Sequence, residues 1–190
     1  VIKVLKHKYN FHKFFTSSFP PVTLFSDNSF DTIISFQVIE HIKDDMLFIN
    51  EIFRLLKPGG TAILTTPNIL MTLTRNPWHI REYTSKSLQR IASKSFKNVE
   101  MKGISGNDKI KKYYNENKKS VQKFKSLDIL NLEKILPAAI YKIPYEILNR
   151  FNRNKLKNQD DTLISSISVD DYFLKNDDPN NLDLFLILKK

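Results

Sequence analysis

The sequence predicts an α/β fold, in which a mostly parallel sheet carries an antiparallel last strand and a helical insertion before that strand. Residues 32–36 and 62–66 are short, almost entirely apolar runs rich in β-branched side chains. Strands buried on both faces of a parallel sheet have this composition. Between these runs, apolar side chains recur at helical spacing and end at a Pro-Gly-Gly turn at 58–60. A last apolar run, 182–188, predicts the terminal strand.

The elements ahead of the first buried strand are less regular. The chain opens on apolar and lysine residues that resemble the last turns of an amphipathic helix. Phe11, Phe14 and Phe15 predict a short strand, and a turn-rich loop follows from Pro20. Because this opening reads as the middle of a fold, we expect the chain to be the C-terminal part of a longer domain.

The central helix has a clear start and a clear face. Asp44 or Asp45 is expected to cap its first free amides. Five apolar side chains form its inner face: Phe48, Ile49, Ile52, Phe53 and Leu56. Strand, helix and strand in this order predict a right-handed βαβ unit.

A second helix and a third strand complete the predicted core. The helix is expected to begin after Thr84, and the strand to span 96–104, with Gly103 and Gly106 closing it. Residues 107–158 are rich in Lys, Tyr and Asn and predict a mainly helical stretch. The expected organisation is a sheet core over 1–106, a basic helical insertion or lid over 107–170, and a returning strand over 171–190.

Composition excludes several classes of protein. The chain has no Cys, so disulfides, thiolate metal sites and cysteine nucleophiles are ruled out. No apolar run approaches the ~18 residues of a membrane span and no signal peptide opens the sequence, which is typical of a cytoplasmic protein. The net charge of +10 is concentrated in residues 107–158, which contain 13 Lys or Arg and only five Asp or Glu. That segment is either a solvated surface or attracts nucleic acid, a phosphorylated substrate or, at the membrane periphery, anionic lipid.

Four sequence pieces, in order, resemble the class I, Rossmann-like methyltransferases that use S-adenosylmethionine. They are Asp-Asn-Ser-Phe-Asp at 27–31 leading to Val-Ile-Glu-His-Ile at 38–42, Leu-Lys-Pro-Gly-Gly at 56–60, Thr-Thr-Pro-Asn at 65–68, and Asn-Pro-Trp-His-Ile-Arg-Glu-Tyr at 76–83. The resemblance implies S-adenosylmethionine as cofactor and a small molecule as methyl acceptor. A sugar or a lipid-linked intermediate is among the candidate acceptors.

The chain also departs from that family. The family binds its cofactor with a glycine-rich loop after the first strand, because the backbone must approach the ligand more closely than a Cβ allows. The first glycine of this chain is Gly59, so the loop is absent from these residues. The resemblance therefore implies a missing N-terminal half, or a partner chain that supplies the rest of the cofactor site.

Candidate site residues follow from the rule that ligands lie beyond the carboxyl ends of the strands. By resemblance, Phe36, Gln37 and Val38 border the cofactor, although packing at a strand end explains them equally well. His79, Arg81 and Tyr83 lie in a predicted loop, which is where substrate contacts are common. Arg81 suits a carboxylate or phosphate, and the alternative is an exposed surface charge.

His41 is the candidate catalytic base, because imidazole titrates near neutral pH. The alternative is a histidine that is hydrogen-bonded at the start of the next helix. Some related methyltransferases bind a divalent metal through a Glu-x-x-Glu-His pattern, but here Gln37 replaces the first glutamate. Since an amide oxygen is a weaker ligand than a carboxylate, we expect no metal.

Three functions therefore compete. Small-molecule methyl transfer leads. A nucleic-acid methyltransferase is disfavoured, because residues 35–38 lack the Asn/Asp-Pro-Pro-aromatic motif that contacts a flipped base. The third is a non-catalytic binding module that retains half of the fold.

Overall fold

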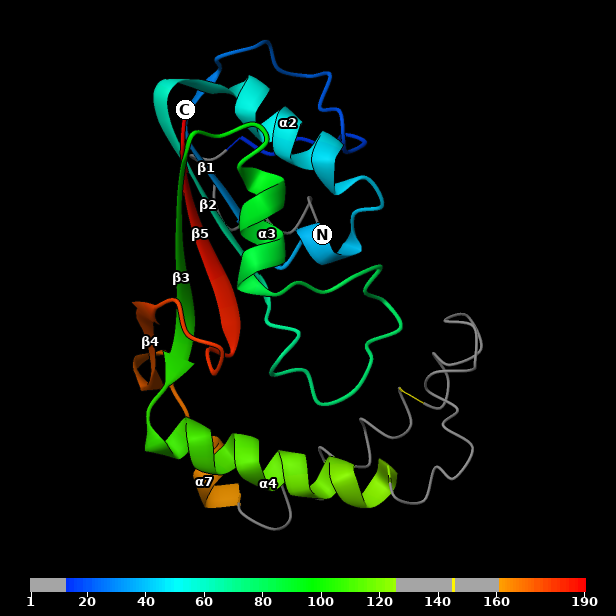
Figure 1. Cartoon of the computed structure of the whole chain (residues 1–190), viewed down its shortest axis with the longest axis vertical. Helices are drawn as coiled ribbons and strands as arrows, with labels where there is room; N and C mark the ends of the chain where they lie inside the picture. The colour runs from blue at the N-terminus through cyan, green and yellow to red at the C-terminus, as the bar shows by residue number, and fades with distance from the viewer. Residues whose placement is uncertain (1–12, 126–144, 146–160) are drawn as a thin grey trace.

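The computed structural model describes residues 13–125, 145 and 161–190, which form an open five-stranded sheet with helices on one face and at one end (Figure 1). The strands are β1 (Phe30–Phe36), β2 (Leu56–Pro67), β3 (Asn98–Gly106), β4 (Tyr172–Asn176) and β5 (Asp183–Lys189). Their order is β1-β2-β5-β3-β4. β1 pairs in parallel with β2, whereas β5 is antiparallel to β2 and β3, and β4 is antiparallel to β3.

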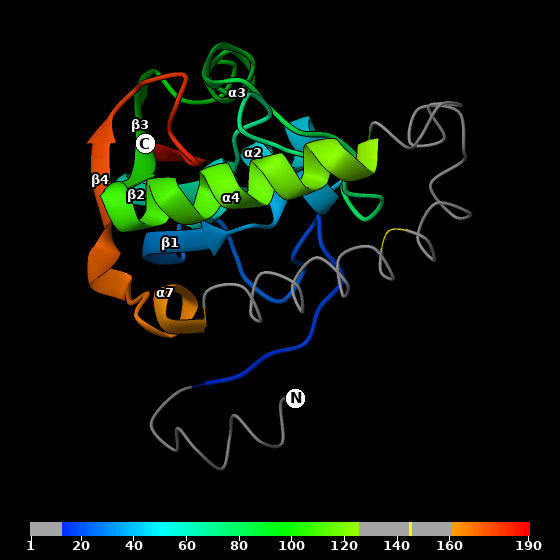
Figure 2. The ribbon, with the colours of Figure 1, turned by 90° about the horizontal axis from the view of Figure 1, so that it is seen from below.

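The helices occupy two places. They are α2 (Asp45–Leu55), α3 (Ser85–Ala92), α4 (Asp108–Lys125) and α7 (Asp161–Ser165), with 3₁₀ turns η1 (Ile39–His41) and η2 (Val169–Asp171). α2 and α3 cover one face of the sheet, while α4 crosses below the end of the sheet where β3 finishes (Figures 1 and 2). Asp44 caps α2 by accepting a hydrogen bond from Leu47 N at 2.8 Å, as one of the two predicted caps.

The two faces of the sheet differ in burial. Ala62 and Leu64 of β2 face α2, and Leu186 of β5 lies on the same face; each is at most 1% exposed. On the opposite face, Ile34 and Phe36 of β1 are 58% and 55% exposed among the described residues. The period of two along a strand places alternate residues on these two faces. One face is therefore the core, and the opposite face is exposed at β1.

The βαβ unit, the helix after Thr84 and the last strand are confirmed, with shifted bounds. Leu56, predicted on the helix, instead begins β2 opposite Phe30, and regular pairing resumes at Thr61. The Pro-Gly-Gly turn is thus an irregularity inside β2. Gly59 has φ +80°, a conformation that favours glycine.

Two other expectations change. The strand predicted around Phe14 and Phe15 is wrong, since residues 13–18 form no strand; Phe11 lies outside the described residues. β4 was not predicted, because its Tyr-Phe-Leu-Lys-Asn sequence is short and all five residues are exposed. Of the predicted helical stretch 107–158, α4 is helical, and residues 126–144 and 146–158 lie outside the described part. The described part of 107–170 lies outside the sheet (Figure 1).

Candidate functional site

Gln37 turns the chain at the carboxyl end of β1. Its φ of +54° lies in the left-handed region, which a non-glycine residue adopts at a cost. Its backbone N donates to Thr65 O at 2.9 Å, and its side-chain Nε2 lies 3.5 Å from Thr65 Oγ1. The turn therefore places the exposed amide of Gln37 over the neighbouring strand.

The three predicted cofactor contacts are adjacent but not equivalent. Phe36 and Gln37 are exposed at the open side of the strand end, whereas Val38 packs partly buried against the core. Phe36 and Gln37 thus offer surface to a ligand. Cofactor contact by these three residues stays a prediction.

Asp183, at the start of β5, is a feature that the sequence did not reveal. Burial raises the pKa of its carboxyl to about 6; a hydrogen bond from Gln37 acts in the opposite direction, and the nearby charge of Glu40 adds to the rise. Asp183 pairs with Pro67 across the sheet. Two acidic side chains, Glu40 and Asp183, therefore lie near the carboxyl ends of β1 and β2.

Glu40 and His41 lie together in η1, directly after this turn. Glu40 is 1% exposed, and its Oε2 accepts a hydrogen bond from Thr66 Oγ1 at 2.9 Å. The Nδ1 of His41 lies 2.9 Å from the carbonyl O of Trp78. Because a carbonyl only accepts, Nδ1 carries a proton, and in the neutral ring Nε2 keeps a lone pair. That Nε2 lies 3.9 Å from Glu40 Oε1.

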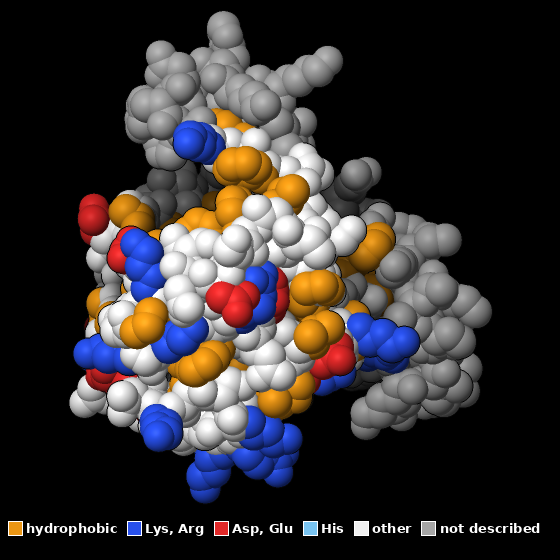
Figure 3. Space-filling model, turned by 90° about the horizontal axis from the view of Figure 1, so that it is seen from above, with side chains coloured by type: hydrophobic (Ala, Val, Ile, Leu, Met, Phe, Trp, Pro, Cys, Tyr) orange, Lys and Arg blue, Asp and Glu red, His pale blue; other side chains and the backbone are white. Residues whose placement is uncertain are grey.

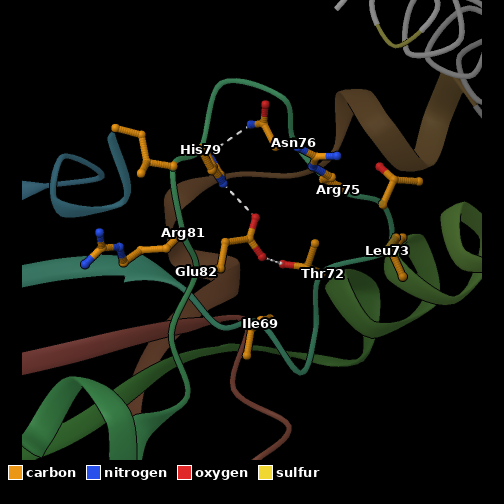
Figure 4. Close-up of a pocket in the computed structure, with 10 residues that line it drawn as sticks. Ile69, Thr72, Leu73, Arg75, Asn76, His79, Arg81 and Glu82 are labelled. Atoms are coloured by element: carbon orange, nitrogen blue, oxygen red, sulfur yellow. Dashed lines mark hydrogen bonds and ion pairs between the residues drawn. The ribbon is translucent and has the colours of Figure 1, made fainter. Parts of the chain in front are cut away.

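His79 lies in the loop between β2 and α3, in a pocket of about 320 Å³ (Figure 4). Its Nδ1 is 2.6 Å from Glu82 Oε1, and its Nε2 is 2.9 Å from Asn76 Nδ2. Trp78 N donates to Asn76 Oδ1, which fixes the amide so that Nδ2 faces the ring. His79 therefore donates to Glu82 through Nδ1 and accepts from Asn76 at Nε2. The other carboxylate oxygen of Glu82 accepts from Thr72 (Figure 4).

Arg81 and Tyr83 anchor this loop to α2. Arg81 forms an ion pair with buried Asp45 and donates to Lys43 O at 2.8 Å, and the hydroxyl of Tyr83 donates to Asp45 at 3.1 Å. The hydrogen bond to Asp45 raises the pKa of Arg81, and burial raises the pKa of Tyr83. Arg81 points away from His79 (Figure 4).

These contacts alter the view of the predicted substrate residues. Tyr83 is 2% exposed, which leaves almost no surface for the substrate contact that the sequence predicted. The guanidinium of Arg81 is already engaged, so a substrate anion would compete with Asp45. Of the three predicted residues, His79 and Arg81 line the pocket, and Tyr83 does not.

The structure brings His41 and His79 together, although they are 38 positions apart. Their rings meet edge to face with centroids 5.0 Å apart. One ligand atom each of Glu40, His41 and His79 lies within 4.8 Å of the others. Sequence reasoning missed this cluster because it compared each motif with a linear pattern. The signal that could have found it is that both histidines follow strands which end at the same edge of the sheet.

Part of the chain is similar to known methyltransferases. The model of the methyltransferase domain family matches residues 2–64. A probable S-adenosylmethionine-dependent methyltransferase of Mycolicibacterium smegmatis is 41% identical over 70 residues, covering 34% of this chain and 27% of that protein. One of Mycobacterium tuberculosis is 36% identical over 84 residues, covering 41% and 31%. The chain therefore matches about a third or less of the length of these curated relatives.

Solved structures of the same description are also similar. Haemonchus contortus phosphoethanolamine N-methyltransferase 2, in complex with S-adenosyl-L-methionine, has a TM-score of 0.43 and 21% identity over 87% of this chain and 34% of that chain. A Thermotoga maritima S-adenosylmethionine-dependent methyltransferase has a TM-score of 0.49 and 12% identity over 87% and 58%.

The segment that matches the methyltransferase family coincides with one unit of the described sheet. The matched residues 2–64 include all of β1 and α2 and most of β2, which form the βαβ unit of the open α/β sheet. Residues 2–64 thus match the methyltransferase domain family, and the described part of the chain forms an open α/β sheet.

Proposed function

We propose that this chain contributes to methyl transfer from S-adenosylmethionine to an oxygen or nitrogen of a small molecule. One observation carries the proposal. The segment that matches methyltransferases ends in the same strands whose carboxyl ends gather Gln37, Glu40 and His41. In open α/β sheets this edge is where ligands bind.

The described residues fit one wall of a cofactor site. Phe36 is 55% exposed beside the exposed amide of Gln37, so an aromatic face and a hydrogen-bonding group are both available. A close-approach loop needs glycine, and no glycine precedes Gly59 in this sequence. We therefore propose that further sequence or a second chain supplies the remaining wall.

His41 is the side chain best suited to take a proton from the methyl acceptor. The bound cofactor would supply an activated methyl group on a sulfonium, so the protein mainly positions the acceptor and removes its proton. The carbonyl of Trp78 holds the His41 ring with the Nε2 lone pair available. Glu40, with Oε1 3.9 Å from that nitrogen, stabilises the imidazolium that forms.

The pocket beside His79 supports a small acceptor. Its volume of about 320 Å³ lies at the lower end of the range typical of small-molecule sites. His79 and Glu82 line it with a paired imidazole and carboxylate. Polar groups of this kind orient a hydroxyl or amine, whereas a nucleic acid would need a longer basic track.

Amide chemical shifts measured by NMR during addition of S-adenosylhomocysteine test where the cofactor lies, and they detect weak binding. We expect shifts at Phe36, Gln37 and Val38 and none in β4. Phe36→Ser should weaken binding several-fold, whereas the matched control Ile34→Ser, which changes an equally exposed residue two positions earlier, should not. Shifts confined to other elements, or equal effects of the two variants, would overturn the placement.

A further inference from the structure

We propose that Glu40, His41 and His79 form a binding site for a divalent transition-metal ion, with zinc as the best-fitting ion. One ligand atom of each residue lies within 4.8 Å of the others. Three ligands around a tetrahedral zinc, at ~2.0–2.1 Å from the ion, are closer together than this, so small side-chain rotations complete the site. Two imidazoles and one carboxylate are a donor set that zinc accepts.

Each proposed ligand is held from behind by a second group. Thr66 donates to Glu40 Oε2 at 2.9 Å, and the other oxygen, Oε1, lies 3.9 Å from His41 Nε2. The carbonyl of Trp78 accepts from His41 Nδ1, and Glu82 accepts from His79 Nδ1 at 2.6 Å. Oxygen acceptors on the remote nitrogen orient metal-binding histidines and raise their basicity. The same tautomer therefore suits both rings for metal binding.

The charge balance at Glu40 supports a cation. This carboxylate is 1% exposed, and the ion-pair partner found for it is His41, which is charged only when protonated. A buried carboxylate needs compensation by a charge or by hydrogen bonds. A divalent ion between Oε1 and the two rings would supply it.

Asn76 is the group that the ion must displace. It donates to His79 Nε2 at 2.9 Å, while Nδ1 makes the shorter contact with Glu82. A neutral amide is a weaker partner than a carboxylate, so the ion binds at Nε2 and leaves the Glu82 contact in place. His41 is 43% exposed at its side chain, so one coordination position stays open to water or another ligand.

The proposed site departs from the expectation, drawn from the sequence, that the chain binds no metal. Gln37 does replace the first glutamate of the linear pattern, and it turns toward Thr65. His79 fills the third position instead, from a loop that the linear pattern does not include. A metal on His41 Nε2 would occupy the lone pair that proton transfer needs, so His41 cannot bind the ion and act as the base at the same time. The metal site is therefore tested separately from the proposed activity.

Calorimetric titration of the chain with zinc chloride, without cofactor, tests the site directly. We expect one ion per chain with a Kd below about 10 μM. His41→Asn and His79→Asn each keep a donor in place of Nδ1–H but remove the Nε2 ligand. Each should weaken zinc binding at least about tenfold, because a ligand is lost. Cobalt(II) should show a visible absorption band that the double variant lacks.

Controls make the test decisive. His7 and His12 are retained in every variant, so binding that survives in the double variant lies outside the proposed site. Asp31→Asn, which changes an exposed carboxylate paired with Lys57 at the start of β1, should leave zinc affinity unchanged. Circular dichroism checks that each variant folds. Absence of zinc binding by the folded wild-type chain, or variants that bind as tightly as wild type, would overturn the proposal.

Discussion

Three acidic side chains near the carboxyl ends of β1 and β2 are buried or half-buried, each beside a different partner. Glu40 meets a hydroxyl and an imidazole, Asp45 meets Arg81 and Tyr83, and Asp183 meets the amide of Gln37. The partner decides what each carboxylate does. Asp45, with a permanent cation, anchors a loop, whereas Glu40 and Asp183 lie where a ligand could balance their charge.

Asp45→Asn tests the anchoring role. The substitution keeps the shape of the side chain and an acceptor for Tyr83 but removes the charge that pairs with Arg81. We expect a loss of about 1–2 kcal/mol of unfolding free energy, discounted because the Arg81 side chain is 40% exposed. Urea denaturation measures it. The control Asp31→Asn should have no measurable effect, and equal destabilisation by the two variants would refute the anchor.

Asp183 predicts a pH dependence of stability. Its folded pKa is about 6, raised from 3.8, so the folded chain keeps a proton that the unfolded chain loses as pH rises from about 4 to 6. This group therefore destabilises the fold increasingly across that window and stays unfavourable at pH 7, by about 2–3 kcal/mol. Asp183→Asn, which is neutral throughout, should be more stable than wild type at pH 7 and similar at pH 3.

Urea midpoints at pH 3, 5 and 7 measure this difference. Asp178→Asn is a matched control of opposite sign, because the backbone amide of Asn180 lowers the pKa of Asp178. Its native carboxylate stabilises the fold at neutral pH, and that stability is lost as pH falls. A constant difference between Asp183→Asn and wild type at all three pH values would contradict the buried-carboxyl account.

Helices and strands with regular apolar periodicity could be predicted from the sequence, whereas elements without it could not. The buried strands and α2 were predictable because apolar periodicity survives in a single sequence. Thr84 caps α3 through a capping box with Ser87, and the sequence indicated the start of that helix. β4 was missed because all five of its residues are exposed, so no buried apolar pattern marks it as a strand. The Glu40, His41 and His79 cluster was missed because it joins η1 to the distant loop between β2 and α3.

Gly103 and Gly59 are needed for different reasons: Gly103 because its surroundings are crowded, and Gly59 because of its backbone conformation. A Cβ at Gly103 would lie 2.1 Å from Asn181 Nδ2, whereas at Gly59 it would meet nothing within 4 Å, although φ there is +80°. Gly103→Ala should therefore cost about 1–3 kcal/mol through overpacking. Gly59→Ala should cost about 1 kcal/mol through strain. Urea midpoints rank the two, and a larger effect at Gly59 would contradict this reading.

In the molecule as a whole, β1 is an edge strand that exposes apolar side chains among the described residues. β1 ends the strand order, and its side chains Ile34 and Phe36 are more than half exposed. Figure 3 shows apolar side chains also reaching the surface, between basic and acidic ones, on the face seen from above. Among the described residues, no helix is both long and apolar enough to span a bilayer.

An open edge next to apolar side chains predicts self-association. Light scattering of the isolated chain should show species larger than a monomer. Ile34→Lys should reduce them, because a charge on an edge strand blocks pairing. The matched surface variant Val169→Lys, on an exposed side chain outside β1, should not. A monodisperse monomer at all concentrations would contradict the open-edge account.

Calorimetric titration with S-adenosylmethionine and S-adenosylhomocysteine tests whether this chain forms one wall of a methyltransferase cofactor site. We predict binding weaker than about 100 μM, or −5.5 kcal/mol, for the chain alone. Adding the preceding sequence of its reading frame should tighten binding at least tenfold, with the gain reduced by Phe36→Ser. Failure of the extended chain to bind either ligand, or binding indifferent to Phe36, would contradict the account.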